Sequence, residues 1–154
     1  FLMAVLVNII YRIDPKHENI SRSRELKQIT RWFVVLLAVM VQLVIVLSGI
    51  GMEINVGSVI SIPIALMFVA AGNYLPKCKQ NYTMGIKLPW TLADEDNWNR
   101  THRLAGYVWT AGGILMLIMG FFHLAYLFFL VFMAMVLIPS VYSYLIYRKK
   151  LKGI

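Results

Sequence analysis

Long apolar blocks separated by polar segments dominate this chain of 154 residues. Residues 32–50 and 56–72 form two such blocks. An α-helix rises about 1.5 Å per residue and the hydrocarbon core of a bilayer is about 30 Å thick, so each block is about long enough for one crossing. The apolar residues 1–11 are too few for a crossing, and we expect them to be the last part of a span that begins before this chain.

The third apolar block extends from Leu104 to Tyr147, which is too long for a single crossing. We expect two spans, over 104–119 and 124–147, joined by a tight hairpin at residues 120–123. Basic segments flank both ends of the block, and an even number of crossings places both flanks on the same side of the bilayer. The predicted fold is all-α: one polytopic transmembrane helix bundle over residues 1–154.

Glycines and prolines add detail to these spans. Gly106, Gly113 and Gly120 recur every seven residues and so share one helical face, which predicts a groove that another helix backbone can approach closely. Pro63 and Pro139 fall inside predicted spans, where a kink is tolerated if neighbouring helices satisfy the freed carbonyl groups.

Composition and charge fix the class and the orientation. Apolar residues make up 60% of the chain and charged residues 14%, which is far from the usual balance of a soluble domain. All 15 Lys and Arg residues lie in the first polar loop, the loop over residues 73–103 and the C-terminal tail. They are Arg12, Lys16, Arg22, Arg24, Lys27, Arg31, Lys77, Lys79, Lys87, Arg100, Arg103, Arg148, Lys149, Lys150 and Lys152. The positive-inside rule therefore predicts that both loops and the C-terminus face the cytoplasm, with the lipid bilayer as the main partner and no direct contact with nucleic acid.

The predicted spans contain no Asp, Glu, Lys or Arg, which disfavours an ion-coupled carrier. Gln42 is the most polar residue within them, and we expect it to make one interhelical hydrogen bond. His123 is expected at the membrane interface, and Cys78 is expected to be an ordinary reduced thiol. Because the common hydrolase, metalloprotease and phosphate-binding motifs are also missing, we expect no catalytic residue, no cofactor and no metal.

The loop over residues 73–103, called the signature loop below, is too long for a connector and too rich in aromatic residues for a disordered one. Its second half predicts a helix with Thr91 as the N-cap and acidic residues 94–96 in the first turn. Asp96 and Arg100 have the spacing of an i,i+4 ion pair. Trp98, Thr101 and His102 would share one face of this helix, against the bundle or the membrane surface.

The signature loop also holds the candidate functional residues. They are Asn73, Pro76, Lys79, Asn81, Gly85, Lys87, Pro89, Trp90, Thr91, Glu95, Trp98, Thr101, His102 and Arg103. Two interpretations stay open: a structured cytoplasmic cap that seals the helix ends, or a surface for recognition or catalysis. A metal site built from Asp94, Glu95 and His102 is disfavoured, since the spacing matches no standard pattern.

The signature loop resembles the defining motif of the SdpI family, membrane proteins that give immunity to the sporulation-delay peptide toxin. The resemblance runs through Gly72-Asn73-Tyr74-Leu75-Pro76, Lys79-Gln80-Asn81-Tyr82 and Gly85-Ile86-Lys87-Leu88-Pro89-Trp90-Thr91-Leu92, and continues through Glu95, Trp98, Thr101-His102-Arg103 and Gly106. Asp14-Pro15-Lys16 and Glu18-Asn19-Ile20 also resemble the family.

This resemblance implies a multi-pass protein of the bacterial inner membrane that binds a hydrophobic peptide toxin and holds a cytosolic repressor protein at the membrane. It also implies that the full protein has further spans before residue 1. The alternative function is a small-molecule transporter or membrane enzyme that uses Lys87, Asp94, His102 and Arg103 of the polar loop.

Overall fold

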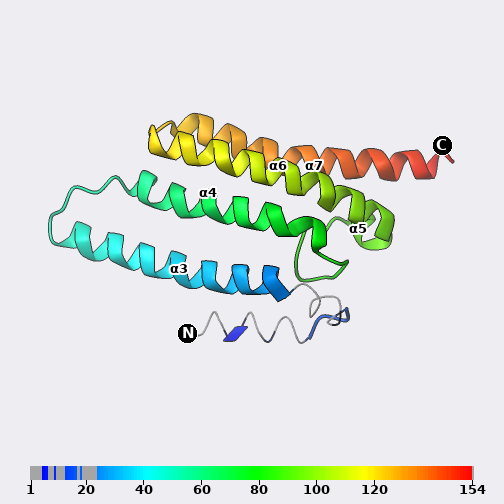
Figure 1. The fold of residues 1–154 in the computed structure, drawn as a ribbon, viewed down its shortest axis with the longest axis horizontal. Helices are drawn as coiled ribbons and strands as arrows, with labels where there is room; N and C mark the ends of the chain where they lie inside the picture. The colour runs from blue at the N-terminus through cyan, green and yellow to red at the C-terminus, as the bar shows by residue number, and fades with distance from the viewer. Residues whose placement is uncertain (1–4, 7–8, 10–12, 17, 19–23, 154) are drawn as a thin grey trace.

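The computed structural model describes residues 5–6, 9, 13–16, 18 and 24–153 (Figure 1). Within these residues every regular element is a helix. The elements are α3 (Arg24–Gly49), α4 (Val56–Tyr74), the 3₁₀ helix η1 (Leu75–Lys77), α5 (Pro89–Ala93), α6 (Glu95–Phe121) and α7 (Ala125–Leu151). The prediction of an all-α bundle is confirmed, while the partial span over residues 1–11 lies largely outside the described residues.

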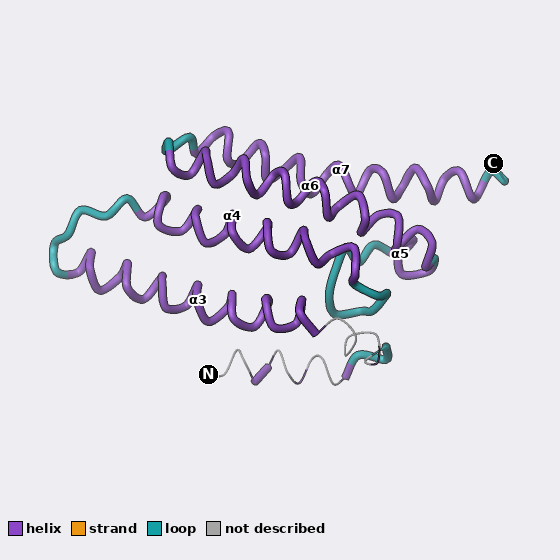
Figure 2. Tube along the Cα trace, in the orientation of Figure 1, coloured by secondary structure: helices purple, strands orange, loops and turns teal. Residues whose placement is uncertain are grey.

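Four of these helices, α3, α4, α6 and α7, are long and apolar enough to cross a membrane. Figure 2 shows α4 running between α3 and α6, and α6 packing on its other side against α7. The α3–α4 connection and the α6–α7 turn lie at one end of the bundle, which we call the turn end. The signature loop and the C-terminus lie at the opposite end (Figure 1).

The close approach of α6 to α4 depends on glycines, as the seven-residue repeat predicted. A Cβ atom at Gly113 would lie 2.8 Å from the backbone nitrogen of Val69 and 3.0 Å from the carbonyl oxygen of Ala65. A Cβ atom at Gly106 would lie 2.4 Å from Cγ of Pro76. The two distances from Gly113 are to backbone atoms of α4 and are shorter than ordinary van der Waals contact. α4 is therefore the helix that occupies the predicted groove.

The N-terminus of α6 differs from the sequence prediction. Thr91 is not the N-cap of a long helix, because it lies inside the short helix α5. Asp94 caps α6 instead, and its carboxylate accepts a hydrogen bond of 3.0 Å from the amide of Asp96. The last part of the signature loop, from Glu95 on, is therefore one continuous helix with the apolar part of α6.

Two smaller expectations fare differently. The predicted hairpin is present, with His123 in the turn at a φ of 59°. Gln42 is exposed on α3, and its interhelical hydrogen bond stays a prediction. It is exposed because α3 packs along α4 with only one face and leaves most of its surface outside the described bundle.

Candidate functional site

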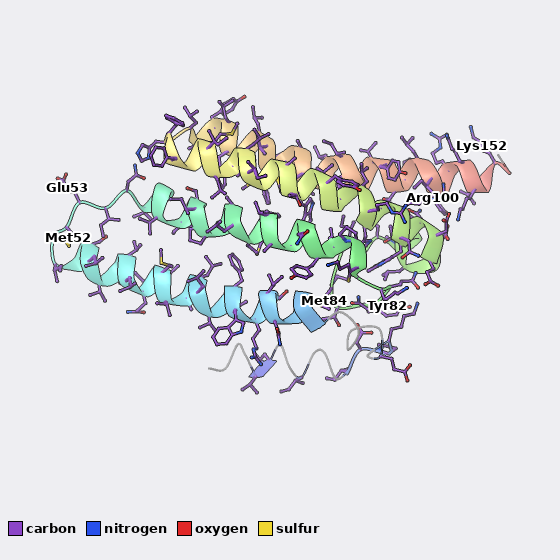
Figure 3. The ribbon with its side chains drawn as sticks, viewed as in Figure 1. Met52, Glu53, Tyr82, Met84, Arg100 and Lys152 are labelled. Carbon is purple, nitrogen blue, oxygen red and sulfur yellow. The ribbon has the colours of Figure 1, made fainter. Side chains whose placement is uncertain are left out.

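The part of the signature loop that precedes α6 folds back onto the first turns of that helix and closes one end of the bundle. Leu75, Cys78 and Met84 are buried there against Trp98 and Ala105 of α6. Figure 3 shows Tyr82 and Met84 at this end, with Met52 and Glu53 at the opposite end. The loop thus has a hydrophobic core of its own, continuous with the α4–α6 contact.

Trp98 is the centre of this core and is fully buried. Its indole nitrogen donates a hydrogen bond of 2.8 Å to the carbonyl oxygen of Cys78. Its ring stacks on the imidazole of His102, with the ring centroids 4.0 Å apart. One side chain therefore anchors the start of the loop and supports the second buried aromatic group.

His102 is fully buried and both of its ring nitrogens have partners. Nε2 accepts a hydrogen bond of 3.0 Å from the amide of Ile86. Nδ1 lies 2.8 Å from the carbonyl oxygen of Trp98, which can only accept. These partners assign the proton to Nδ1 and leave the imidazole neutral, with no nitrogen free to act as a base.

Gly85 makes the contact between the loop and His102 sterically feasible. Its φ of 101° is a conformation that residues with a side chain rarely adopt. A Cβ atom at this position would lie 2.3 Å from Nε2 of His102 and 3.1 Å from the ring of Trp98. The backbone conformation and the close approach both require glycine here.

Asn81 shapes the turn that leads to Gly85. Its buried Oδ1 accepts hydrogen bonds from the amides of Thr83, at 2.9 Å, and Met84, at 2.6 Å. Its Nδ2 donates a hydrogen bond of 2.7 Å to the carbonyl oxygen of Lys79. The amide side chain thereby supplies backbone partners that no helix or sheet provides in this segment.

Thr91 and Gln80 hold the second half of the loop. Thr91 is fully buried, and its hydroxyl accepts from the amide of Leu88, at 2.9 Å, and donates to the carbonyl oxygen of Ile86, at 2.8 Å. Gln80 donates through Nε2 to the carbonyl oxygens of Thr91 and Leu92, each at 2.9 Å. α5 is therefore fixed by side-chain hydrogen bonds at both ends.

A second polar network joins the loop to α7. Trp90 donates from its indole nitrogen to the hydroxyl of Ser143, at 2.9 Å, and its ring stacks on Tyr147. Asn97 donates a hydrogen bond of 3.0 Å to the carbonyl oxygen of Ser143 and accepts one of 3.0 Å from the hydroxyl of Thr101. Pro139, four residues before Ser143, cannot donate to a helical carbonyl, and it lies buried in the same part of α7.

Asp14 ties the segment before α3 to the same loop. Its buried carboxylate accepts hydrogen bonds from the amide of Tyr82, at 2.9 Å, and the hydroxyl of Thr83, at 2.6 Å. Lys16 donates from Nζ to the side-chain oxygen of Gln80. These bonds give the Asp14-Pro15-Lys16 run a structural role, because they hold it against the signature loop.

Ion pairs join the signature loop to the C-terminal end of α7. Lys150 lies 2.6 Å from a carboxylate oxygen of Asp94 and 3.0 Å from one of Asp96, and Asp96 also pairs with Arg100 at 3.0 Å. The Asp96–Arg100 pair was predicted from its spacing. Partial burial is the largest single influence on the pKa of Asp94 and raises it, but the hydrogen bond and charge of Lys150, together with the backbone amides of Asn97 and Asp96, hold this pKa below its ordinary value.

The fourteen candidate residues therefore separate into two groups. The inward group is buried or half-buried and consists of Asn81, Gly85, Trp90, Thr91, Trp98, Thr101 and His102. The outward group is exposed and consists of Asn73, Pro76, Lys79, Lys87, Pro89, Glu95 and Arg103. The inward group builds the loop, and the outward group is what a partner could reach.

The residues named for a membrane enzyme or transporter are not brought together. His102 is enclosed, Arg103 is exposed on α6, and Asp94 is paired with Lys150. Lys87 donates to the carbonyl oxygen of Thr83, at 3.0 Å. Across the described part of the chain no group of three His, Cys, Asp or Glu side chains is placed to hold a metal ion.

The candidate functional residues predicted from sequence do not include four members of the buried network: Asp14, Gln80, Asn97 and Ser143. Asn97 and Gln80 stand inside the signature loop, and Asn97 directly precedes the buried Trp98. Asp14 and Ser143 are distant in sequence from the loop. Nothing in local spacing could place them against it.

A cavity of about 400 Å³ opens at the turn end of the bundle. It lies between the start of α4, the end of α6 and the start of α7, and Ile60, Ile64 and Phe128 form its apolar part. Ser61 and His123 add polar groups. The cavity thus lies at the end of the described bundle that is opposite the signature loop.

Four apolar helices joined by short turns at one end and a hydrogen-bonded loop at the other define a multi-pass membrane protein. The sequence model of the SdpI/YfhL protein family matches residues 77–143, which cover most of the signature loop, all of α6 and most of α7. This match confirms the resemblance to the family that the signature loop predicted.

One curated relative is the immunity protein SdpI of Bacillus subtilis (strain 168), which is 31% identical over 121 residues. The aligned part is 77% of this chain and 58% of the relative, so this chain spans less than two thirds of that protein. Among solved structures, none matches the chain.

Proposed function

We propose that this protein gives its cell immunity to a membrane-active peptide toxin and acts by binding rather than by catalysis. The observation that carries the proposal is the 31% identity, over 121 residues, to a protein named for immunity. That alignment is longer than the signature loop, so it also includes transmembrane helices that a hydrophobic peptide could contact.

The turn-end cavity is the part of the bundle best suited to receive the peptide. Ile60, Ile64 and Phe128 offer an apolar surface that opens at the level of the helix ends. A hydrophobic peptide that enters the bilayer from outside would reach this end first if the basic end faces the cytoplasm. We therefore propose that an apolar side chain of the toxin occupies the cavity.

The signature loop is proposed to act at the cytoplasmic side. Its outward residues, Lys79, Lys87, Glu95 and Arg103 among them, form an exposed polar surface on a backbone fixed by buried hydrogen bonds. Such a surface suits a cytosolic repressor that is held at the membrane. The test is the cellular location of a tagged candidate repressor, which should be at the membrane only in cells that carry both the protein and the toxin.

The binding step is tested with the purified full-length protein and a fluorescent sporulation-delay-type toxin peptide in lipid nanodiscs. Saturable binding is expected. Ala125→Leu adds a larger side chain to the lining of the cavity and should weaken toxin binding. The matched control Ala134→Leu makes the same change at an exposed position of α7 outside the cavity and should leave toxin binding unchanged. Absence of saturable binding to the wild-type protein would remove the mechanism, and equal effects of both variants would remove the cavity from it.

A further inference from the structure

A second cavity, of about 620 Å³, lies at the basic end of the bundle between α6 and the last turns of α7. Basic side chains line it: Arg100, Arg148, Lys149, Lys150 and Lys152. Figure 3 shows Arg100 on α6 and Lys152 at the end of α7, on the same side of the bundle end. Neither the family resemblance nor the immunity proposal gives this groove a role.

The charge of the groove is only partly neutralised. Lys150 and Arg100 pair with Asp94 and Asp96, as described above. Within the described residues, Arg148, Lys149 and Lys152 have no acidic partner. The groove therefore carries an uncompensated positive charge and is complementary to an anion.

The groove also has an apolar wall. Tyr142, Leu145 and Ile146 line it, and they lie on α7 just before the basic residues. Leu145 is 51% exposed, although it belongs to a helix that is long and apolar enough to span the membrane. An anionic headgroup beside Arg148 and Lys149 would leave its acyl chains along this wall.

We propose that the groove between α6 and the C-terminal end of α7 binds an anionic glycerophospholipid, with its phosphate among the basic residues and its acyl chains against the apolar wall. The chemistry that recognises the ligand is a phosphate diester carrying acyl chains. A free phosphate group would use the basic residues but not the wall. The proposal is independent of toxin binding, because the turn-end cavity lies at the other end of the bundle.

The position of the ion pairs explains how the site is held. Lys150 is fixed against Asp94 and Asp96, and these acidic residues begin the helix α6. The signature loop is thereby tied to the end of α7 at the edge of the groove. A bound lipid at this edge would contact a part of α7 that the loop already positions.

The test uses the full-length protein extracted from bilayers of equal parts phosphatidylcholine and phosphatidylglycerol, with bound lipid measured by native mass spectrometry. The wild-type protein should retain phosphatidylglycerol in preference to phosphatidylcholine. The triple variant Arg148→Gln, Lys149→Gln, Lys152→Gln should retain at least about tenfold less, since each basic group near an anionic lipid contributes about a factor of five. Lys150 and Arg100 stay in place, so the ion pairs to α6 are kept.

The matched control is the triple variant Lys77→Gln, Lys79→Gln, Lys87→Gln, which removes the same charge from exposed positions of the signature loop. It should retain phosphatidylglycerol like the wild type. An equal loss in both variants would overturn the proposal in favour of general surface attraction, as would wild-type protein without any lipid preference.

Two competing ligands distinguish binding of the whole lipid from binding of its headgroup alone. Glycerophosphoglycerol, which has the headgroup without acyl chains, should fail to displace the bound lipid, and so should inorganic phosphate. Displacement by either one at millimolar concentration would overturn the lipid proposal and assign the groove to a free phosphate. Circular dichroism of each variant distinguishes a loss of bound lipid from a loss of helical structure.

Discussion

The amide of Ile86 donates a hydrogen bond of 3.0 Å to Nε2 of His102, across the core of the signature loop. The two residues belong to the two halves of that loop, and this bond holds its turn against α6. Because both groups are buried or half-buried, removal of the acceptor leaves the donor without a partner.

The variant His102→Ala should therefore lower the free energy of unfolding by about 1–3 kcal/mol through the unpaired amide alone, with a further loss from the cavity beside Trp98. Thermal unfolding in detergent, followed by circular dichroism, measures the change. The control Asn99→Ala removes a polar side chain from an exposed position of α6 and should have a small effect. Equal stability of both variants would show that the bond does not support the loop.

Gly85 and Gly51 form a matched pair for a second prediction. Both have positive φ, at 101° and 87°, but a Cβ atom at Gly51 would meet no atom within 4 Å, whereas one at Gly85 would meet His102. Gly51→Ala should cost about 1–2 kcal/mol from backbone strain alone. Gly85→Ala should cost more and reduce the yield of folded protein in the membrane. Equal yields and equal unfolding temperatures would contradict the close packing at Gly85.

The ion pair between Asp94 and Lys150 predicts a pH dependence. Partial burial raises the pKa of Asp94, but Lys150 and the backbone amides of Asn97 and Asp96 together hold it below its ordinary value. A lowered carboxyl pKa stabilises the fold above the unfolded-state value of about 3.9, and the stabilisation is lost as the pH falls through the folded-state value. Asp94→Asn keeps an N-cap residue but loses the charge.

At neutral pH this variant should be less stable than the wild type by at most about 1 kcal/mol, since the pair is partly exposed to solvent. The difference should shrink as the pH falls below about 4 and through the lower folded-state pKa. Unfolding temperatures of both proteins across this pH range measure it, with Glu53→Gln as a control carboxylate at the turn end. A difference that persists unchanged at low pH would show that the charge of Asp94 is not its source.

The orientation of the bundle is tested by cysteine labelling. The native Cys78 is 2% exposed and should react little, so single introduced cysteines report their own position. Glu53→Cys at the turn end should react with a membrane-impermeant maleimide in intact cells. Lys87→Cys in the signature loop should react only after the cells are permeabilised. The reverse pattern would contradict the orientation inferred from the basic residues.

Much of the fold could be predicted because membrane insertion imposes simple rules on sequence. The long apolar blocks predicted the helices, and the repeat of Gly106, Gly113 and Gly120 predicted a close helix contact that α4 makes. What failed was local. Thr91 has the residue type of an N-cap, but Pro89 starts a separate short helix and Asp94 takes the capping role of α6.

The signature loop could be found from sequence, but its internal division could not. Spacing placed Trp98, Thr101 and His102 on one helical face, and all three are buried as that face implies. Sequence could not show that Nε2 of His102 is used by the amide of Ile86, because that contact depends on the path of a loop without regular structure. For the same reason, sequence could not show that the carboxylate of Asp14 accepts a hydrogen bond from the amide of Tyr82.

The most direct test of the immunity proposal is survival of toxin-sensitive cells that express the full-length protein, challenged with a sporulation-delay-type peptide toxin. We expect the wild type and Ala134→Leu to protect the cells, and Ala125→Leu to protect them less at equal levels in the membrane. Cells that die at the same toxin concentration with and without the wild-type protein would contradict the immunity function.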